Sequence, residues 1–228
     1  MLRVFIGWDS REDIAYQVAR KSLLDNASVD VDVTPIRLDE MVDRGLYTRE
    51  IDPLASTEFT YSRFLVPHLA GYEDWALFVD CDFLFFGDIA GLNDHRDPSK
   101  AVFCVQHDYA PREGVKMDGK AQTTYPRKNW SSFMWFNCAH PSTKGLTPEV
   151  VNRETGAYLH RMQWAADDEI GALPTGWNWL EGWNEPPETG RPTAVHYTSG
   201  GPWFENYQDV AYADEWRRHA AEIEGRAA

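Results

Sequence analysis

The stretch WALFVDCDFLFFGD, from Trp75 to Asp88, carries the strongest pattern in the sequence. Its first residues, Trp75 to Val79, are all apolar, which indicates a strand buried on both faces. Asp80 and Asp82 interrupt this run, and a second apolar run, Phe83 to Phe86, follows directly. An unpaired carboxylate between buried segments costs several kcal/mol, so a positive group is expected to meet these two acids.

Asp80 and Asp82 are expected to act as a pair. Side chains two residues apart lie on the same face of an extended strand, so both carboxylates can point into one crevice. A divalent cation is the simplest partner for them. The alternative is a turn whose carboxylates cap a following helix.

The start of the chain predicts a β-α-β unit. A short apolar strand, Arg3 to Trp8, precedes a helix that ends at Asn26, and Val29 to Arg37 then alternates apolar and polar residues like a half-exposed strand. This order implies a parallel sheet with helices on its faces, in which ligands bind at the carboxyl ends of the strands. Asp9 follows the first strand and Asp80 a later one, so both are expected at this edge.

The remainder of the chain predicts further strands and helices around one irregular segment. His107 to Trp130 lacks periodicity and is basic in places, so it is expected to pass over the active face. The other expected elements are a helix over Tyr61 to Leu69, strands over Ala101 to Gln106 and Ser132 to Cys138, a helix that begins at Thr147 and buries Val151, Tyr158 and Met162, and a closing helix over Tyr207 to Ile223.

Length, charge and composition limit the classes of function. The 228 residues contain no linker-like segment, so one domain over residues 1–228 is expected. The formal net charge of −14 argues against a nucleic-acid-binding surface. The 10 tryptophans exceed what the core needs, so some are expected to line a surface that binds sugars or bases.

The cysteines and the chain ends bear on the compartment. Cys81, Cys104 and Cys138 have no metal-ligand spacing, so buried free thiols in a reducing compartment are expected. The first residues enter a strand directly and no apolar run is as long as a membrane span, which predicts a cytoplasmic protein without a signal peptide or transmembrane segment. The sequence leaves the oligomeric state open.

Four further motifs accompany the two aspartates in a fixed order. They are TYSRFLVPHL (Thr60 to Leu69), FNCAHP (Phe136 to Pro141), DDEIGALPTGWNWL (Asp167 to Leu180) and HYTSGGPW (His196 to Trp203). This series, which spans roughly residues 3 to 203, resembles glycosyltransferase family 8, the retaining transferases related to glycogenin and to bacterial galactosyltransferases.

The resemblance implies a GT-A fold, an α/β (Rossmann-like) domain with a mixed, mostly parallel central sheet flanked by helices. Its nucleotide-binding part would cover about residues 1–106 and its acceptor side about 107–205, with a closing helix at about 206–224. The implied activity is metal-dependent transfer of a hexose, with retained anomeric configuration, from a nucleotide diphosphate sugar to a saccharide or glycoconjugate acceptor. The usual donor of this family is a UDP-sugar, and the usual setting is polysaccharide biosynthesis.

Asp80, Asp82 and His196 are the expected metal ligands. Two carboxylates and one imidazole suit manganese or magnesium, whose charge would offset that of a leaving diphosphate. A lone histidine is more often an ordinary packed side chain. His196, however, precedes Gly200 and Gly201, whose backbone N–H groups are expected to approach phosphate.

The donor is expected to contact several strand ends. The carboxylate of Asp9 would accept a hydrogen bond from the nucleobase in a pocket shaped by Gly7 and Trp8, or else cap the first helix. Arg63 would pair with the phosphate or the sugar, or else form an ordinary ion pair. Asn137 would bind sugar hydroxyls, or else only close a turn. By resemblance, the donor's ribose would contact Asp80 as well.

The resemblance also supplies catalytic and acceptor residues. Asp167 would bind hydroxyls of the donor sugar, and Asp168 would lie beside the anomeric carbon as a nucleophile or as a stabiliser of an oxocarbenium-like transition state. Such a run of acids is otherwise typical of a solvated helix start. The acceptor-binding candidates, with core packing as the alternative for the tryptophans, are Trp177, Asn178, Trp179, Trp183 and Trp203.

Three residues depart from the family pattern. Ala139 stands where the family has Gly, Asp168 where it has Gln, and Gly201 where it has a phosphate-binding Lys. Candidates from the irregular segment that would supply the missing positive charge are Lys116, Lys120, Arg127 and Lys128.

Two other functions compete with transfer. Haloacid-dehalogenase-like phosphatases also place Asp-x-Asp after an apolar strand, but on their first strand and with Thr or Val where Leu84 stands here. A nucleotide- or carbohydrate-binding module without transfer activity is the second alternative, because the phosphate-binding Lys is missing.

Overall fold

The chain forms an α/β structure, and the computed structural model describes residues 1–51, 55–108, 114–115, 121–122 and 126–227. The strands are β1 (Leu2–Gly7), β2 (Val31–Ile36), β3 (Trp75–Val79), β4 (Phe83–Phe85), β5 (Val102–Cys104), β6 (Gly114–Val115), β7 (Ala121–Gln122), β8 (Phe133–Asn137), β9 (Ile170–Ala172), β10 (Trp179–Leu180) and β11 (Ala194–His196). The α-helices are α1 (Asp13–Asn26), α2 (Leu38–Asp43), α3 (Val66–Leu69), α4 (Pro141–Lys144), α5 (Pro148–Arg153), α6 (Gly156–His160) and α7 (Ala213–Ala227). Short 3-10 helices cover Ser62–Leu65, Ile89–His95, Trp130–Ser132, Asp167–Glu169, Thr175–Asn178 and Glu205–Tyr207.

The central sheet has six strands in the order β2-β1-β3-β8-β5-β9. All of them run parallel except β8, which pairs antiparallel with β3 and β5. A second sheet has the order β10-β11-β4. The expected α/β class with a mixed, mostly parallel sheet is therefore confirmed.

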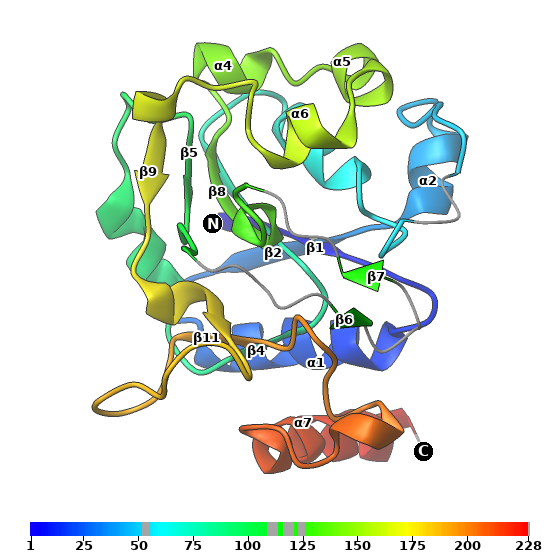
Figure 1. Cartoon of the computed structure of the whole chain (residues 1–228), viewed down its shortest axis with the longest axis vertical. Coiled ribbons are helices and arrows are strands. Elements are labelled where there is room, and N and C mark those ends of the chain that lie inside the picture. Colours follow the sequence, from blue (N-terminus) through cyan, green and yellow to red (C-terminus); the bar gives the residue numbers. More distant parts are fainter. Residues whose placement is uncertain (52–54, 109–113, 116–120, 123–125, 228) are drawn as a thin grey trace.

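Helices cover both faces of the central sheet. In Figure 1, α1 and α7 lie below the sheet, whereas α4, α5 and α6 lie above it. Because both faces are covered, every residue of β3 is buried, as its unbroken apolar run predicts. The edge strand β2 instead alternates half-buried and exposed residues, in agreement with its sequence pattern.

The strand register defines two opposite edges of the central sheet. Asp80 follows β3 at the carboxyl edge, where its N–H donates to the carbonyl of Ser132 just before β8. At the amino edge, Trp75 at the start of β3 pairs with Asn137 at the end of β8. With about 3.3 Å per residue, the length of β3 separates these two edges by roughly 16 Å.

The structure changes several predicted helix boundaries. The helix expected from Thr147 is two helices, because the chain is extended at Glu154 and the side chain of Thr155 caps α6 by accepting from the N–H of Tyr158. The closing helix begins at Ala213, later than expected, since Tyr212 before it adopts a left-handed φ of 62°.

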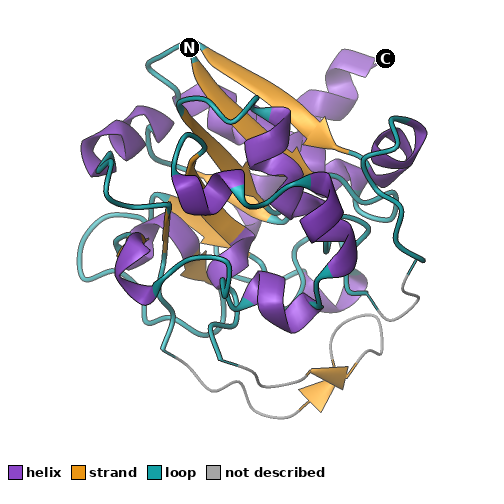
Figure 2. Ribbon diagram, turned by 90° about the horizontal axis from the view of Figure 1, so that it is seen from above, coloured by secondary structure: helices purple, strands orange, loops and turns teal. Residues whose placement is uncertain are grey.

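The irregular segment is described only in part. Its strands β6 and β7 form a two-stranded unit away from the central sheet (Figure 2). Lys116 and Lys120, two of the expected sources of positive charge, lie outside the described residues.

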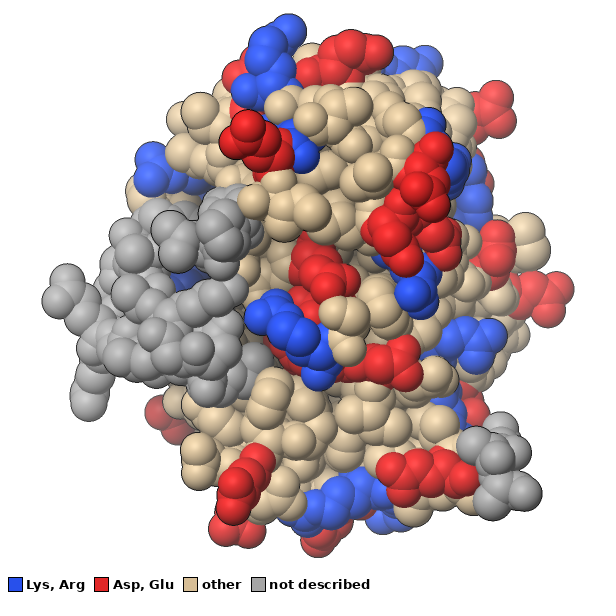
Figure 3. Space-filling view, turned by 90° about the vertical axis from the view of Figure 1, so that its right-hand side faces the viewer, with Lys and Arg blue, Asp and Glu red and all other residues tan. Residues whose placement is uncertain are grey.

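Surface charge and cysteine burial agree with the sequence. On the face drawn in Figure 3, basic and acidic side chains are interspersed, without a broad basic patch among the described residues. Cys81, Cys104 and Cys138 are buried free thiols, as predicted. Across the described part of the chain, no helix combines the length and the apolar composition that crossing a membrane requires.

Candidate active site at the carboxyl edge of the sheet

Asp80, Asp82 and His196 come together at the carboxyl edge of the sheet. One potential ligand atom from each residue lies within 4.8 Å of the others. Nε2 of His196 is 3.3 Å from Oδ2 of Asp82. The His196 side chain is 2% exposed, whereas those of Asp80 and Asp82 are 13% and 19% exposed, so the cluster opens to solvent through its carboxylates.

Strand pairing brings the histidine to the aspartates. β4 begins directly after Asp82 and pairs antiparallel with β11, which sets Phe83 opposite His196. The N–H of Tyr197 also donates to the carbonyl of Asp82. The rings of Phe83 and His196 stack with centroids 4.5 Å apart and planes 16° apart, which restricts the orientation of the imidazole.

A buried arginine holds Asp80. Nη1 of Arg63 donates to Oδ1 of Asp80 at 2.7 Å and to the carbonyl of Ser131 at 3.0 Å. Burial, partly offset by Arg63, raises the pKa of Asp80 to about 6. Arg63 was expected to face the donor, but in the structure it is 5% exposed and is engaged by the protein itself.

Asn178 lies behind His196 and not on an acceptor surface. It is fully buried, and its Oδ1 is 2.9 Å from Nδ1 of His196. Its Nδ2 donates to Oγ of Ser132 at 2.9 Å and to the carbonyl of Asn129 at 3.3 Å. The expected contact with an acceptor does not fit this burial.

Glu12 is an acid at the site that was missed in the sequence. It occupies the N-cap position of α1 and is 6% exposed. Burial and then the charges of Asp82 and Asp9 raise its pKa to about 8. An acid that follows β1 and precedes the apolar stripe of α1 was the available signal in the sequence.

Asp9 lies at the expected strand end with both carboxylate oxygens occupied. It is fully buried, Oδ1 accepts from the N–H and Nε of Arg11, and Oδ2 accepts from Nη2 of Arg11 and the N–H of Glu58. These hydrogen bonds, chiefly those from Arg11, lower its pKa against the effect of burial. A nucleobase reaches this carboxylate only if Arg11 moves.

The two residues before Asp9 are also held by the protein. A Cβ on Gly7 would lie 2.5 Å from the ring of Phe59, so only glycine fits there without a shift. The indole of Trp8 donates to Oδ1 of Asp13 at 2.7 Å, and the guanidinium of Arg37 lies 3.6 Å from its ring centroid.

Packing explains why glycine replaces the family's lysine at position 201. A Cβ on Gly201 would lie 1.9 Å from Cζ3 of Trp203, so no lysine side chain fits while this ring is in place. The Trp203 ring itself packs against Tyr197 and Trp216. Gly200 has a φ of 138°, a conformation that favours glycine.

Asn137, Asp167 and Asp168 lie away from the cluster of Asp80, Asp82 and His196. Asn137 ends β8 at the amino edge, where Nδ2 donates to the carbonyl of Lys100 at 3.1 Å. Asp167 and Asp168 precede β9, which runs parallel to β5, so they belong to the same amino edge; in Figure 1 this turn lies high, near α4. These strand positions place the expected catalytic acids at the edge of the sheet opposite Asp80 and Asp82, and their catalytic role stays a prediction.

Arg127 and Lys128 are the described candidates for the missing positive charge. Nη2 of Arg127 pairs with Oδ1 of Asp167 at 2.5 Å, and its Nη1 donates to the carbonyl of Arg161. Lys128 is 6% exposed and precedes Asn129, whose Nδ2 donates to Oγ1 of Thr198. The segment that carries Lys128 thus borders the loop that contains Gly200.

The tryptophans divide between core and surface. Trp177 and Trp179 are 7% and 6% exposed and pack inside the protein. Trp203 is half-buried. Trp183 is also half-buried, and its indole donates to Oγ of Ser199 at 3.1 Å, beside the histidine loop. Of these four acceptor candidates, Trp183 and Trp203 keep ring surface available to a ligand.

The residues present fit a divalent cation. Two carboxylates and an imidazole nitrogen are a suitable partial ligand set for manganese or magnesium, and water or phosphate oxygens would complete it. The raised pKa of Asp80 indicates that positive charge in the cluster falls short of what two buried carboxylates require.

The most informative sequence comparison is with a plant protein. The chain is 54% identical over 217 residues to Protein CDI of Arabidopsis thaliana, an alignment that covers 94% of this chain and 84% of that protein. The chain belongs to the Protein CDI family. No protein-family model matches it.

Solved structures relate this Protein CDI family member to glycosyltransferases of the GT-A fold. The bifunctional glycosyltransferase WbbM matches with a TM-score of 0.67 at 15% identity, and GlyE of Streptococcus pneumoniae TIGR4 with 0.64 at 15%. The galactosyltransferase LgtC matches with 0.57 at 11%, over 97% of this chain and 96% of LgtC. The first two alignments cover 96% of this chain, but only 49% of WbbM and 60% of GlyE. It has the GT-A fold and resembles glycosyltransferase family 8.

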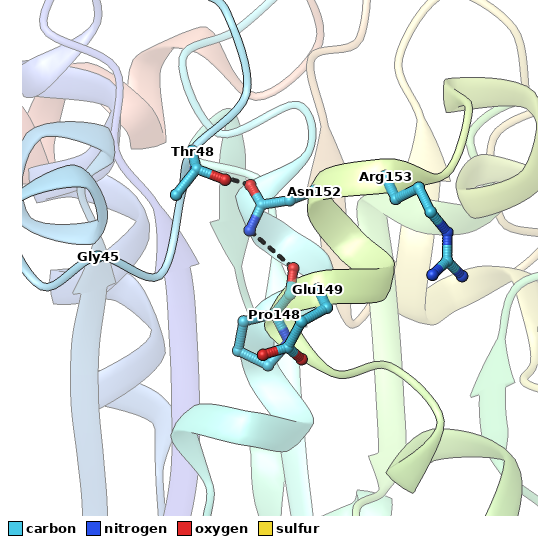
Figure 4. Close-up of a pocket in the computed structure, with 6 residues that line it drawn as sticks. All are labelled: Gly45, Thr48, Pro148, Glu149, Asn152 and Arg153. Atoms are coloured by element: carbon cyan, nitrogen blue, oxygen red, sulfur yellow. Dashed lines mark hydrogen bonds between the residues drawn. The ribbon is translucent and has the colours of Figure 1, made fainter.

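A surface hollow of about 320 Å³ lies elsewhere on the Protein CDI family fold (Figure 4). Its residues come from the loop after α2 and from α5, and none belongs to the metal cluster. Asn152 crosses it, accepting from the N–H of Thr48 and donating to the carbonyls of Leu46 and Pro148. These hydrogen bonds tie the loop to α5, which gives the hollow a structural role.

Proposed function

We propose that this chain is a metal-dependent glycosyltransferase that moves a hexose from a nucleotide diphosphate sugar to a saccharide or glycoconjugate acceptor with retained configuration. The observation that carries the proposal is the Asp80–Asp82–His196 cluster at the carboxyl edge of a GT-A sheet. The names of the similar structures support the class of reaction, since LgtC is a galactosyltransferase with donor and acceptor sugar analogs bound. A UDP-sugar is the proposed donor, and polysaccharide assembly is the proposed setting.

Asp80, Asp82 and His196 would hold Mn²⁺ or Mg²⁺. When bound, such a cation stabilises the negative charge of a leaving diphosphate as a Lewis acid. Arg63 keeps Asp80 in position, and the Phe83 ring keeps the His196 imidazole in its plane. The backbone N–H groups of the loop that contains Gly200 and Gly201 are proposed to contact phosphate, that of Gly200 once it releases the carbonyl of Tyr197.

The remaining contacts are proposed from the strand ends and the half-buried rings. The nucleobase would bind near Gly7, Trp8 and Asp9 once Arg11 leaves Asp9. The acceptor would stack on Trp183 and Trp203, whose rings are half-buried. Positive charge for the diphosphate would come from Lys128, because its segment borders the histidine loop.

A ligand panel tests the proposal most directly. Mn²⁺ with UDP or a UDP-sugar should raise the melting temperature of the wild-type protein, because a ligand that binds only the native state stabilises it by mass action. Slow hydrolysis of the cognate donor should appear with Mn²⁺ and disappear with a chelator. Asp82→Ala and His196→Ala should stay folded and lose both effects, whereas Asp214→Ala, at an exposed position of α7, should keep them.

The same panel separates the rival functions. Hydrolysis of a generic phosphomonoester with Mg²⁺, without any response to nucleotide sugars, would establish a phosphatase. Donor binding without turnover on any saccharide acceptor would establish a binding module. Retention is tested by NMR, since the anomeric proton of the product must show the configuration of the donor.

A further inference from the structure

Asn178 and Ser132 together fix which nitrogen of His196 carries a proton. The carbonyl of Asn129 can only accept hydrogen bonds, and it receives one from Oγ of Ser132 at 2.7 Å and one from Nδ2 of Asn178 at 3.3 Å. The amide of Asn178 is therefore oriented with Nδ2 toward Asn129 and Oδ1 toward His196.

The same geometry makes Nδ1 of His196 a donor. The two groups beside it are Oδ1 of Asn178 at 2.9 Å and Oγ of Ser132 at 3.5 Å. The hydroxyl proton of Ser132 is already given to Asn129, so both neighbours can only accept. Nδ1 of His196 must carry a proton, which leaves Nε2 as the nitrogen available to a cation.

Nε2 is the nitrogen that faces the acids. It lies 3.3 Å from Oδ2 of Asp82, on the side of the ring opposite Asn178. Histidines that bind a metal usually have this arrangement. One ring nitrogen, here Nδ1, donates to a fixed acceptor, and the other, here Nε2, coordinates the ion.

We infer that Asn178 is a positioning residue that holds His196 in the Nδ1–H tautomer, so that Nε2 coordinates a divalent cation with Asp80 and Asp82. The inference rests on the proposed metal binding and explains the buried asparagine of the LPTGWN stretch. Ser132 links the aspartates to the residues behind His196. Its carbonyl accepts from the N–H of Asp80, and its hydroxyl accepts from Nδ2 of Asn178.

Two substitutions of Asn178 separate the acceptor role from packing. Asn178→Leu keeps the branched shape of the side chain and removes every hydrogen bond that it makes, so Mn²⁺ affinity should fall by about 10- to 100-fold. Asn178→Asp keeps an acceptor for Nδ1 and loses the donors, so Mn²⁺ affinity should recover most of the loss even if stability does not. Mn²⁺ binding is measured by titration calorimetry and by the EPR signal of the free ion, without any donor.

Asn152→Leu is the matched control. Asn152 is also fixed by hydrogen bonds to backbone groups, but far from the cluster, in the hollow of Figure 4. Asn152→Leu should lower the stability of the protein and leave its Mn²⁺ affinity unchanged. An equal fall in affinity in both leucine variants would assign the effect to general destabilisation and overturn the inference.

The tautomer of His196 is read independently by ¹⁵N NMR of the metal-free wild-type protein, compared with His196→Gln for assignment. The Nδ1–H form at neutral pH is expected, and an Nε2–H form would overturn the inference even if Asn178→Leu failed to fold. Wild-type protein that binds no Mn²⁺ would remove the proposed function, whereas wild-type binding that Asn178→Leu fully retains would remove only the role of Asn178.

Discussion

Arg63 and Asp80 form a nearly buried ion pair, with Nη1 of the arginine 2.7 Å from Oδ1 of the aspartate and the two side chains 5% and 13% exposed. The arginine contributes a positive charge to the cluster that is present without any metal. Burial still raises the pKa of Asp80 to about 6, so this pair balances the cluster only in part.

Arg63→Met should destabilise the protein strongly. Removing one partner of a buried ion pair leaves the other charge uncompensated, at a cost of about 3 to 5 kcal/mol. Urea unfolding measures the loss. Arg153→Met, which removes an exposed pair with Glu154, should cost less than about 1 kcal/mol. Equal losses in the two variants would show that Asp80 does not depend on Arg63.

Stability should fall as pH rises from about 6.5 to 8. The pKa of Glu12 rises from 4.5 to about 8 on folding, so in this window the folded state holds a proton that the unfolded state has lost. Each such group lowers the free energy of unfolding by up to about 1.4 kcal/mol per pH unit. Below about pH 6.5 the slope from His107 and His160 has the opposite sign, because burial lowers the pKa of each to about 3, and it offsets the slope from Glu12 and Asp80.

Glu12→Gln isolates the share of Glu12 in this slope. The variant should show a flatter stability profile above pH 6 and should be more stable than wild type at pH 8, as measured by urea unfolding in the presence of a chelator. The exposed Glu224→Gln serves as the control and should leave the profile unchanged. A wild-type slope that persists in Glu12→Gln would contradict the assignment.

Gly201→Ala should destabilise the protein by about 1 to 3 kcal/mol, because the added methyl group overlaps the Trp203 ring and forces it to move. Thermal and urea unfolding measure the effect. Gly225→Ala on α7, where a Cβ meets nothing within 4 Å, should cause no loss. If Gly201→Lys proved stable and bound nucleotide more tightly, Trp203 would not be what excludes the family's lysine.

Asp168→Asn should change donor hydrolysis and transfer by no more than about twofold, since the residue is exposed at the amino edge of the sheet, away from the cluster. Rates with the cognate donor and Mn²⁺ measure this, and Asp82→Asn provides the inactive comparison. A large loss of transfer with intact donor binding would restore the role that the family resemblance gives to Asp168.

The cluster itself was predictable from the sequence because strong local patterns define it. The apolar runs on each side of Asp80 and Asp82 fix a strand, a short break and a second strand, and the order of motifs points to His196. The fold class follows from the β-α-β opening for the same reason. In both cases the pattern extends over enough residues to favour one structure.

The surroundings of the other candidate residues could not be predicted from the sequence. Where Asn137 and Asp168 lie depends on strand register. Asn137 and Asp168 occur in motifs that resemble those of the family, but β8 runs antiparallel and β9 begins at the amino edge, which a sequence pattern does not reveal. The sequence also does not reveal which group a polar side chain will bind in the folded protein. Asp9 is occupied by Arg11, two residues later, and Asn178 by a histidine from another strand.

The pairing of β4 with β11 also sets the order of events while the chain is translated. Asp80 and Asp82 leave the ribosome well before residues 194–196, so a nascent chain exposes the two acids without their histidine. The proposed cation site is therefore complete only after residues 194–196 have emerged and β11 has paired with β4.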